Sequence, residues 1–403
     1  MRNNILYAQS GGPTAVINAS AYGVIAEAKK LGLGKIFAGI NGIEGILQEN
    51  IAEVTNLSEE QLNLLKNTPG TAFGSCRYHL PDADKSPDVY RKIADIFEKY
   101  QIGCFFYNGG NDSMDTCSKI AHYFDDNKID CQVIGIPKTI DNDLDQTHHC
   151  PGYGSAAKFI ATVMHEMALD TASYTKGKVT VVEVMGRDTG WLTAASIVAS
   201  HNGAGPDLVY LPESPFDTEQ FIEDVTNVYK TKHRCLVAVA EGIKDKDGNY
   251  ISTYGAMDNF NHVQMGGTAY RLAKILEHHN FKTRAVELNL PQRCGGHILS
   301  KTDRNEAIQS GRYAVRLWQK GKTCCMVAIK AKSDNGKYKV SYTAVPVEQV
   351  ANAVKYVPDQ YILPNGQLDN KLLDYILPLM EGTVTQQYID GTPHYFKLDK
   401  IKY

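Results

Sequence analysis

Short apolar runs alternate with longer segments of helical period through most of the sequence, and this alternation constrains the fold more than any other feature. The runs are typical of buried strands, and they are Ile5–Ala8, Gly103–Tyr107, Val133–Ile136, Val179–Met185, Leu208–Leu211, Leu236–Ala240 and Arg284–Leu288. The amphipathic segments predict helices at Ala15–Lys30, Ser113–Tyr123, Ala156–Ala168, Thr218–Tyr229 and Thr268–His278. This order of elements predicts an α/β fold with mainly parallel sheets covered by helices.

The chain has 403 residues, which is more than one hydrophobic core usually supports. We therefore expect two Rossmann-like lobes with a cleft between them. After about Pro346 the pattern changes to a helical stretch at Val347–Val354, a loop with Pro and Gly, and a second helical stretch at Leu368–Met380. We interpret this part as a short C-terminal extension.

Charge, cysteine usage and hydrophobicity limit the partners and the location that the sequence predicts. The net charge of -3 predicts no general affinity for nucleic acid or for a membrane. None of the nine cysteines forms a C-x-x-C pair, and several lie inside apolar runs, which is typical of reduced thiols. The N-terminus lacks the apolar core of a signal peptide, and no apolar stretch reaches membrane-spanning length. We expect a cytoplasmic protein.

Two strands end in glycine pairs that open helices, at Gly11-Gly12 and at Gly109-Gly110. Ligands of open α/β sheets bind at this edge, where helix N-termini present free N–H groups to anions. Glycine lets the backbone approach a phosphate closely, so two such loops suit a clamp for pyrophosphate. Two tight turns that bind nothing are the alternative.

The run Pro137–Asp143 carries the strongest chemical signal, because it follows a strand and contains a lysine, a threonine and two carboxylates without hydrophobic periodicity. One of Asp141 and Asp143 can take the proton of an attacking hydroxyl while the other supports Mg²⁺ or orients the first. Lys138 can neutralise charge on a transferred phosphoryl group. The run predicts phosphoryl transfer to a hydroxyl, and a solvated turn with capping aspartates is the alternative.

Further candidates lie near predicted loops or strand ends. Glu241 ends a strand and can accept hydrogen bonds from sugar hydroxyls. Guanidinium groups can hold phosphate oxygens through paired hydrogen bonds, and the arginines in such positions are Arg77, Arg187, Arg284 and Arg293. The adjacent His148 and His149 do not indicate zinc, because neighbouring side chains on an extended chain point apart and nothing nearby completes a tetrahedral set.

Taken in order, these motifs resemble those of the phosphofructokinase family. The matching segments are Gly11-Gly12, Gly74–Arg77, Gly109–Ser113, Pro137–Asp143, Val181–Arg187, Glu241-Gly242 and Gln292–Gly296. Their order and spacing across most of the chain make the resemblance specific. It implies a two-lobed enzyme that transfers a phosphoryl group to the 1-hydroxyl of fructose 6-phosphate. Residues 1–152 with 292–345 would form the lobe for the phosphoryl donor, and 153–291 with 346–403 the lobe for the sugar phosphate.

The resemblance also implies a role for each candidate. Asp141 is the base, Asp143 is its supporting carboxylate, and Thr139 touches the sugar. Lys138 and Arg187 complete the catalytic set. The residues that would contact the donor are Gly11, Gly12, Arg77, Gly110, Asp112, Ser113 and Lys138. The residues that would contact the sugar phosphate are Thr139, Asp141, Lys178, Met185, Gly186, Arg187, Glu241, Arg284 and Arg293.

In this family an arginine at the position of Arg284 comes from a neighbouring subunit. The resemblance therefore implies a homo-oligomer, either a dimer or a tetramer, with a shared active site. Lys178 stands where the family often has a second such arginine, and a lysine there keeps the charge but loses the bidentate geometry. Leu290 lies where many members have a polar side chain, so phosphate binding would depend more on Arg284 and Arg293.

Two positions favour the pyrophosphate-dependent branch of the family. ATP users typically have glycine where this chain has Asp112 and Lys138. The Asp112 carboxylate would clash with an ATP α-phosphate and repel it, whereas pyrophosphate would avoid this contact. Asn111 stands where members commonly have an acid that helps to bind the cofactor Mg²⁺, and an amide is a weaker ligand. We expect Asp112 to share that role or Mg²⁺ to arrive bound to pyrophosphate.

A pyrophosphate-linked reaction is expected to be readily reversible, and two alternatives to it stay open. An ATP-dependent phosphofructokinase fits the family but not Asp112 and Lys138. A non-catalytic regulatory subunit fits the fold but does not need a base at Asp141. A related ketose such as sedoheptulose 7-phosphate is a conceivable additional acceptor.

Overall fold

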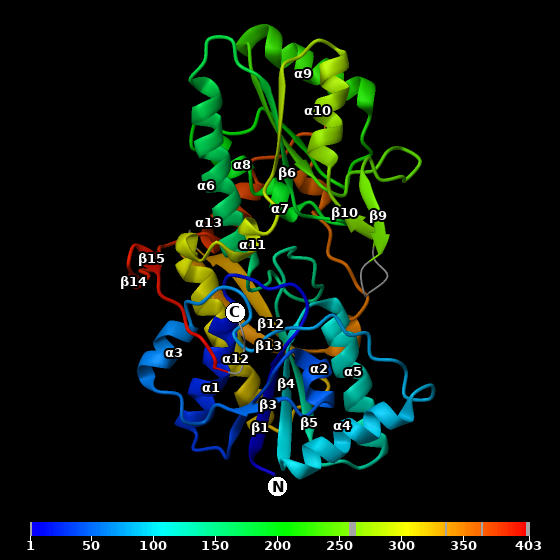
Figure 1. Cartoon of the computed structure of the whole chain (residues 1–403), viewed down its shortest axis with the longest axis vertical. Coiled ribbons are helices and arrows are strands. Elements are labelled where there is room, and N and C mark those ends of the chain that lie inside the picture. Colours follow the sequence, from blue (N-terminus) through cyan, green and yellow to red (C-terminus); the bar gives the residue numbers. More distant parts are fainter. Residues whose placement is uncertain (1, 258–262, 335–336, 364–365, 400–403) are drawn as a thin grey trace.

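The computed structural model describes residues 2–257, 263–334, 337–363 and 366–399. Two main sheets lie in the two halves of an elongated molecule, the larger in the lower half of Figure 1 and the smaller in the upper half. Helices pack on both sheets. This is the α/β architecture with mainly parallel strands that the sequence predicts.

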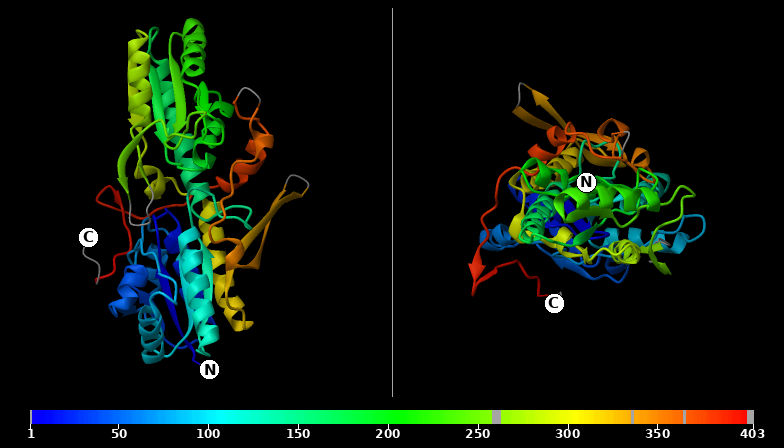
Figure 2. Two further views of the ribbon diagram at one scale, coloured as in Figure 1. Left: turned by 90° about the vertical axis from the view of Figure 1, so that its right-hand side faces the viewer. Right: turned by 90° about the horizontal axis from the view of Figure 1, so that it is seen from above.

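The larger sheet has the strand order β13-β12-β5-β4-β1-β2-β3. Its strands are β1 (Asn4–Gln9), β2 (Ile36–Gly39), β3 (Ile51–Glu53), β4 (Ile102–Gly109), β5 (Gln132–Pro137), β12 (Cys325–Asp334) and β13 (Lys337–Pro346). The central strands pair in parallel, whereas β3 and β13 pair antiparallel at the two edges. The β12–β13 hairpin projects from this half of the molecule (Figure 2).

The smaller sheet is wholly parallel, with the order β11-β6-β8-β7. Its strands are β6 (Val179–Val184), β7 (Leu208–Tyr210), β8 (Cys235–Ala240) and β11 (Thr283–Glu287). Two short antiparallel pairs lie outside both sheets, β9 (Thr253–Met257) with β10 (Val263–Met265), and β14 (Tyr388–Ile389) with β15 (Thr392–Pro393).

Each sheet has its own helices, as Figure 1 shows. Those of the first half are α1 (Ile17–Lys30), α2 (Gly42–Leu47), α3 (Glu59–Leu65), α4 (Pro87–Lys99), α5 (Asn111–Asp126) and α12 (Lys301–Gln319). Those of the second half are α6 (Tyr153–Ala172), α7 (Trp191–Ala194), α8 (Ile197–His201), α9 (Thr218–Lys232), α10 (Thr268–His278) and α13 (Leu372–Leu379). The remaining helical segments are α11 (Pro291–Cys294), η1 (Gly296–Ile298), η2 (Val347–Gln349) and η3 (Asp359–Tyr361).

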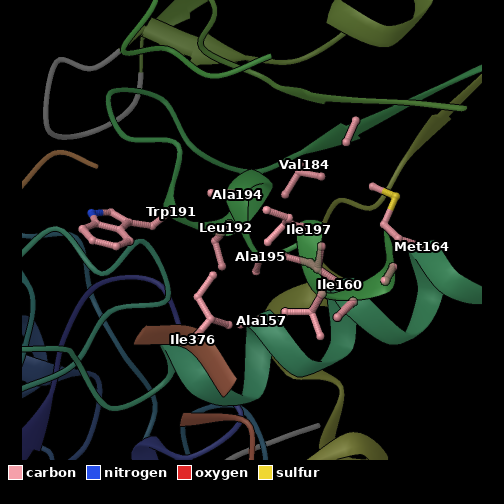
Figure 3. Packing of buried hydrophobic residues seen from close by; sticks show 14 of the residues in the cluster. Ala157, Ile160, Met164, Val184, Trp191, Leu192, Ala194, Ala195, Ile197 and Ile376 are labelled. Carbon is pink, nitrogen blue, oxygen red and sulfur yellow. The ribbon is translucent and has the colours of Figure 1, made fainter. Parts of the chain in front are cut away.

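The core of the second half forms around α6. Ala157, Ile160 and Met164 recur at helical spacing on α6 and belong to one buried cluster with Trp191 and with Ile376 of α13 (Figure 3). Because α13 covers this cluster, the C-terminal part of the chain belongs to the core and is more than a loose tail. The chain then returns to the first half, where Phe396 is buried among side chains of β1 and α1. The lobe boundaries given above stay a prediction.

Parallel pairing brings the functional loops together. β1 pairs with β4 and β4 with β5, so that the loops after Gln9, Gly109 and Pro137 leave the same edge of the larger sheet. The loops after β6 and β8 leave one edge of the smaller sheet in the same way. Ligand sites of α/β proteins form at such edges.

The predicted strands and helices of the first 290 residues all occur, most of them with shifted ends. The predicted helix at Val347–Val354 is wrong, because only the short 3₁₀ turn η2 forms and Asn352 adopts φ +62°, which a right-handed helix does not allow. The predicted helix at Leu368–Met380 begins later, at Leu372. None of the helices in the described part of the chain is long and apolar enough to cross a membrane.

Candidate active site

A cavity of about 820 Å³ lies where the loops after the strands of the two sheets face each other. Most of the predicted site residues line it, namely Gly11, Gly12, Arg77, Gly110, Asn111, Asp112, Ser113, Lys138, Thr139, Asp141, Asp143, Met185, Arg187, Glu241 and Arg293. Gly186 lies behind the cavity wall, where its N–H donates to Glu241 Oε1 over 3.3 Å. The sequence motifs predict these residues as parts of one site, and the fold brings them to one place.

Lys138 joins the two glycine loops. Its side chain is buried, its Nζ donates to the carbonyl oxygen of Gly12 over 2.8 Å, and its backbone N–H donates to that of Gly109 over 3.1 Å. Burial lowers the pKa of Lys138 to about 8, although the carboxylates of Asp141 and Asp143 oppose this shift. The lysine therefore places a positive charge at the floor of the cavity.

A side chain on Gly11 or Gly12 would be in tight contact with a cationic side chain of the cavity. Gly11 adopts φ +74°, and a Cβ built on it would lie 3.3 Å from Lys138 Nζ. A Cβ on Gly12 would lie 3.3 Å from a guanidinium nitrogen of Arg293. The two glycines thus let the backbone and two cations approach the same space, as an anion such as a phosphate requires.

Asp141 and Asp143 form a buried pair of carboxylates on the loop after β5. Burial, together with the like charge of Asp143, raises the pKa of Asp141 to about 7. Burial also raises the pKa of Asp143. The backbone N–H of Asp141 donates to Thr139 Oγ1 over 3.0 Å, and Thr189 Oγ1 donates to the carbonyl oxygen of Asp141 over 3.2 Å. A carboxyl with a pKa near neutrality is suited to general base chemistry.

Arg187 and Glu241 face the carboxylate pair from the smaller sheet. Arg187 Nε is buried and has no hydrogen-bond partner among the described residues. Buried donors are normally paired, so this N–H is suited to bind a ligand in the cavity. Burial raises the pKa of Glu241 to about 7, and the charge of Asp141 adds to this effect. The two sheets thus supply charges of both signs to one cavity.

The side-chain amide of Asn111 lies between the carboxylate pair and the chain after η2. The amide lies 3.3 Å from Asp143 Oδ2, and with its nitrogen turned to the other side it donates to the carbonyl oxygens of Val350 and Ala353 over 3.0 and 3.2 Å. We assign the second orientation, because it makes two hydrogen bonds and satisfies two acceptors. The Asn111 amide oxygen then faces Asp143, and two facing oxygens are donors that a hard cation such as Mg²⁺ accepts.

The chain after η2 supplies a residue that sequence reasoning missed. The backbone N–H of Lys355 donates to the carbonyl oxygen of Asp143 over 2.8 Å, and its buried Nζ donates to the carbonyl oxygens of Thr147 and His148 over 3.1 and 3.0 Å. The carbonyl oxygen of Lys355 accepts from Trp191 Nε1 over 2.9 Å. No sequence motif connects Lys355 with the loop after β5, because they are far apart along the chain.

A second set of contacts from the C-terminal part holds Asn142. This residue adopts φ +56°, its amide nitrogen donates to the Tyr375 hydroxyl over 2.7 Å, and its amide oxygen accepts from the backbone N–H of Cys150 over 3.0 Å. The Tyr375 hydroxyl in turn donates to the carbonyl oxygen of His148 over 2.7 Å. An asparagine between two aspartates is a local signal for such a left-handed turn, and it could have been read from the sequence.

Lys178 and Arg284 do not reach the cavity. Lys178 is exposed just before β6, and Arg284 is exposed at the start of β11, where it pairs with Thr180. Both lie at the N-terminal edge of the smaller sheet, whereas the cavity lies at its C-terminal edge. Within one chain these two residues are therefore separate from the other predicted site residues.

A cleft between two doubly wound lobes that holds a carboxylate pair, a buried lysine and arginines is the arrangement of an α/β phosphotransferase. The chain belongs to the phosphofructokinase family, whose model matches residues 4–318.

Similar proteins cover most or all of the chain. It is 39% identical, over 99% of its length and 97% of the other, to a pyrophosphate–fructose 6-phosphate 1-phosphotransferase of Halomonas elongata. It is 31% identical, over 88% of its length and 90% of the other, to a sulfofructose kinase of Alkalicoccus urumqiensis. The structure matches the crystal structure of a pyrophosphate-dependent phosphofructokinase from Nitrosospira multiformis with a TM-score of 0.90, at 37% identity and over 100% and 98% of the two chains.

Proposed function

We propose that this protein transfers a phosphoryl group reversibly between pyrophosphate and the 1-hydroxyl of fructose 6-phosphate, giving fructose 1,6-bisphosphate and phosphate. The full-length relative from Halomonas elongata carries the name of this activity. The observation that carries the choice of donor is the position of Lys138, whose ammonium group lies buried between the two glycine loops. It places a cation where the phosphates of a small donor would lie, and Asp112 lines the same cavity.

In the forward direction, the Asp141 carboxylate accepts the proton of the 1-hydroxyl as the hydroxyl oxygen bonds to one phosphorus of pyrophosphate. The bridging P–O bond breaks, and phosphate leaves with the electron pair. In the reverse direction protonated Asp141 returns the proton. Asp143 raises the pKa of Asp141, which strengthens it as a base. Lys138 and Arg187 stabilise the charge on the transferred group.

The sugar phosphate occupies the side of the cavity that faces the smaller sheet. Glu241 accepts hydrogen bonds from its hydroxyls, Met185 and Thr139 contact the ring, and the N–H of Gly186 holds the Glu241 carboxylate in place. Arg293 lines the cavity, and its guanidinium group approaches Gly12. It is placed to bind a phosphate there.

Mg²⁺ is the proposed cofactor, and it would neutralise charge on pyrophosphate. The Asn111 amide oxygen and the carboxylates of Asp112 and Asp143 are the residues that would hold it, because oxygen donors suit this ion. The reduced state of the nine cysteines, none of which is paired in the described structure, supports a cytoplasmic location.

The proposed active unit is a homo-oligomer with a shared site. Exposed Lys178 lies directly before β6 and exposed Arg284 at the start of the neighbouring β11, away from their own cavity, where their positive charges would bind a phosphate held by a second subunit. A second subunit would bring its own cavity to them.

Phosphorus NMR of the purified protein tests the reaction in both directions. With fructose 6-phosphate, Mg²⁺ and pyrophosphate we expect signals of fructose 1,6-bisphosphate and phosphate, and with those two products we expect pyrophosphate to form. Turnover with ATP in place of pyrophosphate would contradict the choice of donor. Faster turnover of sulfofructose than of fructose 6-phosphate would contradict the choice of acceptor.

A further inference from the structure

Three side chains of metal-binding type meet on the first half of the molecule, outside the cavity. His122 lies near the end of α5, Cys324 directly before β12, and Glu348 in η2. Cys324 Sγ lies 3.0 Å and His122 Nε2 3.3 Å from the same oxygen, Glu348 Oε1. All three ligand atoms lie within 4.8 Å of one another, and no other such group of His, Cys, Asp and Glu occurs in the described part of the chain.

These separations suit a zinc ion. With Zn–S bonds of about 2.3 Å and Zn–N or Zn–O bonds of about 2.0 Å, ligand atoms at the corners of a tetrahedron lie roughly 3.3–3.6 Å apart. The observed contacts of Glu348 with Cys324 and with His122 are close to this range. The exposed side chains of His122 and Glu348 and the partly buried side chain of Cys324 are therefore close to a tetrahedral arrangement.

The surroundings of His122 also fit a ligand. Its Nδ1 lies 3.4 Å from Ser118 Oγ, one turn earlier on α5, which leaves Nε2 to face Glu348. A hydrogen bond to the second ring nitrogen is what fixes the orientation of metal-binding histidines. The side chains of His122 and Glu348 are 62% and 44% exposed, so an ion can enter from solvent and keep a water molecule as fourth ligand.

The ligand types select the ion. A thiolate with an imidazole and one carboxylate is a set that Zn²⁺ favours, whereas Mg²⁺ and Ca²⁺ favour oxygen donors alone. A surface ion pair of His and Glu would by itself contribute little to the stability of the fold. It would also not account for a thiol directed at the same carboxylate oxygen.

We propose that His122, Cys324 and Glu348 form a Zn²⁺ site with an open fourth position. The site is separate from the proposed reaction and does not depend on it. On binding, Zn²⁺ replaces the thiol proton of Cys324, which is released to solvent. The ion would tie α5 to the chain on both sides of the β12–β13 hairpin, and the other end of α5 carries Asn111 and Asp112 in the cavity.

Cobalt spectroscopy on the full chain tests the proposal. The reduced, chelator-treated protein is titrated with Co²⁺ in the presence of excess Mg²⁺, which occupies sites made of oxygen donors. We expect saturation at one Co²⁺ per chain and a thiolate-to-cobalt charge-transfer band. Cys324→Ser should abolish the band, whereas Cys294→Ser, which removes an exposed cysteine elsewhere in the chain, should keep it. A band that persists in Cys324→Ser, or no band in the unchanged protein, would overturn the proposal.

Zinc affinity gives a second readout. In competition with a chromophoric chelator, His122→Ala should weaken Zn²⁺ binding at least about tenfold, as expected for loss of a ligand. His279→Ala, which removes an exposed histidine at the end of α10, should leave the affinity unchanged. Zn²⁺ should also raise the Tm of the unchanged protein but not that of Cys324→Ser. Equal zinc affinity in His122→Ala and His279→Ala would contradict the site.

Discussion

The backbone N–H of Lys355 donates to the carbonyl oxygen of Asp143, and the Lys355 ammonium group donates to two further carbonyl oxygens just beyond that loop. We predict that Lys355→Met loses the side-chain bonds and lowers the free energy of unfolding by about 2–3 kcal/mol, because two buried acceptors lose a charged donor. It should also lower kcat more than it raises KM, since the loop that carries Asp143 is less well held.

Urea unfolding and steady-state kinetics measure both effects. Lys371→Met is the matched control, because Lys371 is exposed and lies in the same C-terminal part of the chain. A Lys355→Met protein with unchanged kcat would show that the contact does not position the catalytic loop.

The pH dependence of the reaction follows from the carboxylate pair. Asp141 accepts a proton only when it is ionised, and its pKa is raised to about 7, so kcat should fall as the pH decreases through about 7. Asp143 is a like charge that raises this pKa, so Asp143→Asn should shift the acid limb of the profile to lower pH while lowering the maximal rate. An acid limb that stays in place, or moves to higher pH, would contradict the assignment of Asp141 as the base.

Alanine variants of two glycines distinguish the effect of backbone strain from the effect of lost space at the site. Gly11 and Gly32 both adopt positive φ, at +74° and +62°, but a Cβ on Gly11 would approach Lys138 Nζ whereas nothing lies within 4 Å of one on Gly32. We expect both alanine variants to lose about 1–2 kcal/mol of stability. Only Gly11→Ala should raise the KM for pyrophosphate, by about tenfold or more, because it displaces the cation at the donor site. Equal kinetics in the two variants would argue against a donor site at this loop.

The proposed shared site predicts complementation between two inactive variants. Asp141→Asn should lose at least about a hundredfold in kcat, and Arg284→Ala should lose the phosphate contact that one subunit lends to its neighbour. In a mixed dimer of the two variants, one of the two sites combines the intact Asp141 of one subunit with the intact Arg284 of the other. Activity should return on mixing and subunit exchange, up to about a quarter of that of the unchanged protein for a randomly mixed dimer. Mixtures that stay inactive after proven exchange would contradict a site shared through Arg284.

The strands, the helices between them and the glycine loops could be predicted because their signals are local. Apolar periodicity marks each element, and parallel pairing then brings the loops at Gly11, Gly110 and Pro137 to one edge. The direction of the strands also explains why Arg284 is remote from the cavity. Arg284 lies near the N-terminal end of β11, whereas ligands of such sheets bind beyond the C-terminal ends of the strands.

The C-terminal part could not be predicted in the same way. The segment after Pro346 has apolar residues at helical spacing, yet it is extended over the loop after β5 and held by contacts of Lys355 and Asn111. Such contacts join residues that are far apart in the sequence, and no local pattern encodes them. The same holds for the hydrogen bond between Asn142 and Tyr375.

The most direct test of the account compares kcat/KM for pyrophosphate and for ATP in the unchanged protein and in the double variant Asp112→Gly/Lys138→Gly. Far-UV circular dichroism confirms that the variant is folded. We predict that the unchanged protein prefers pyrophosphate by about a hundredfold or more. The variant should lose at least about a hundredfold in kcat/KM for pyrophosphate while its preference shifts toward ATP. An unchanged protein that uses ATP equally well, or a variant with unaltered pyrophosphate kinetics, would contradict it.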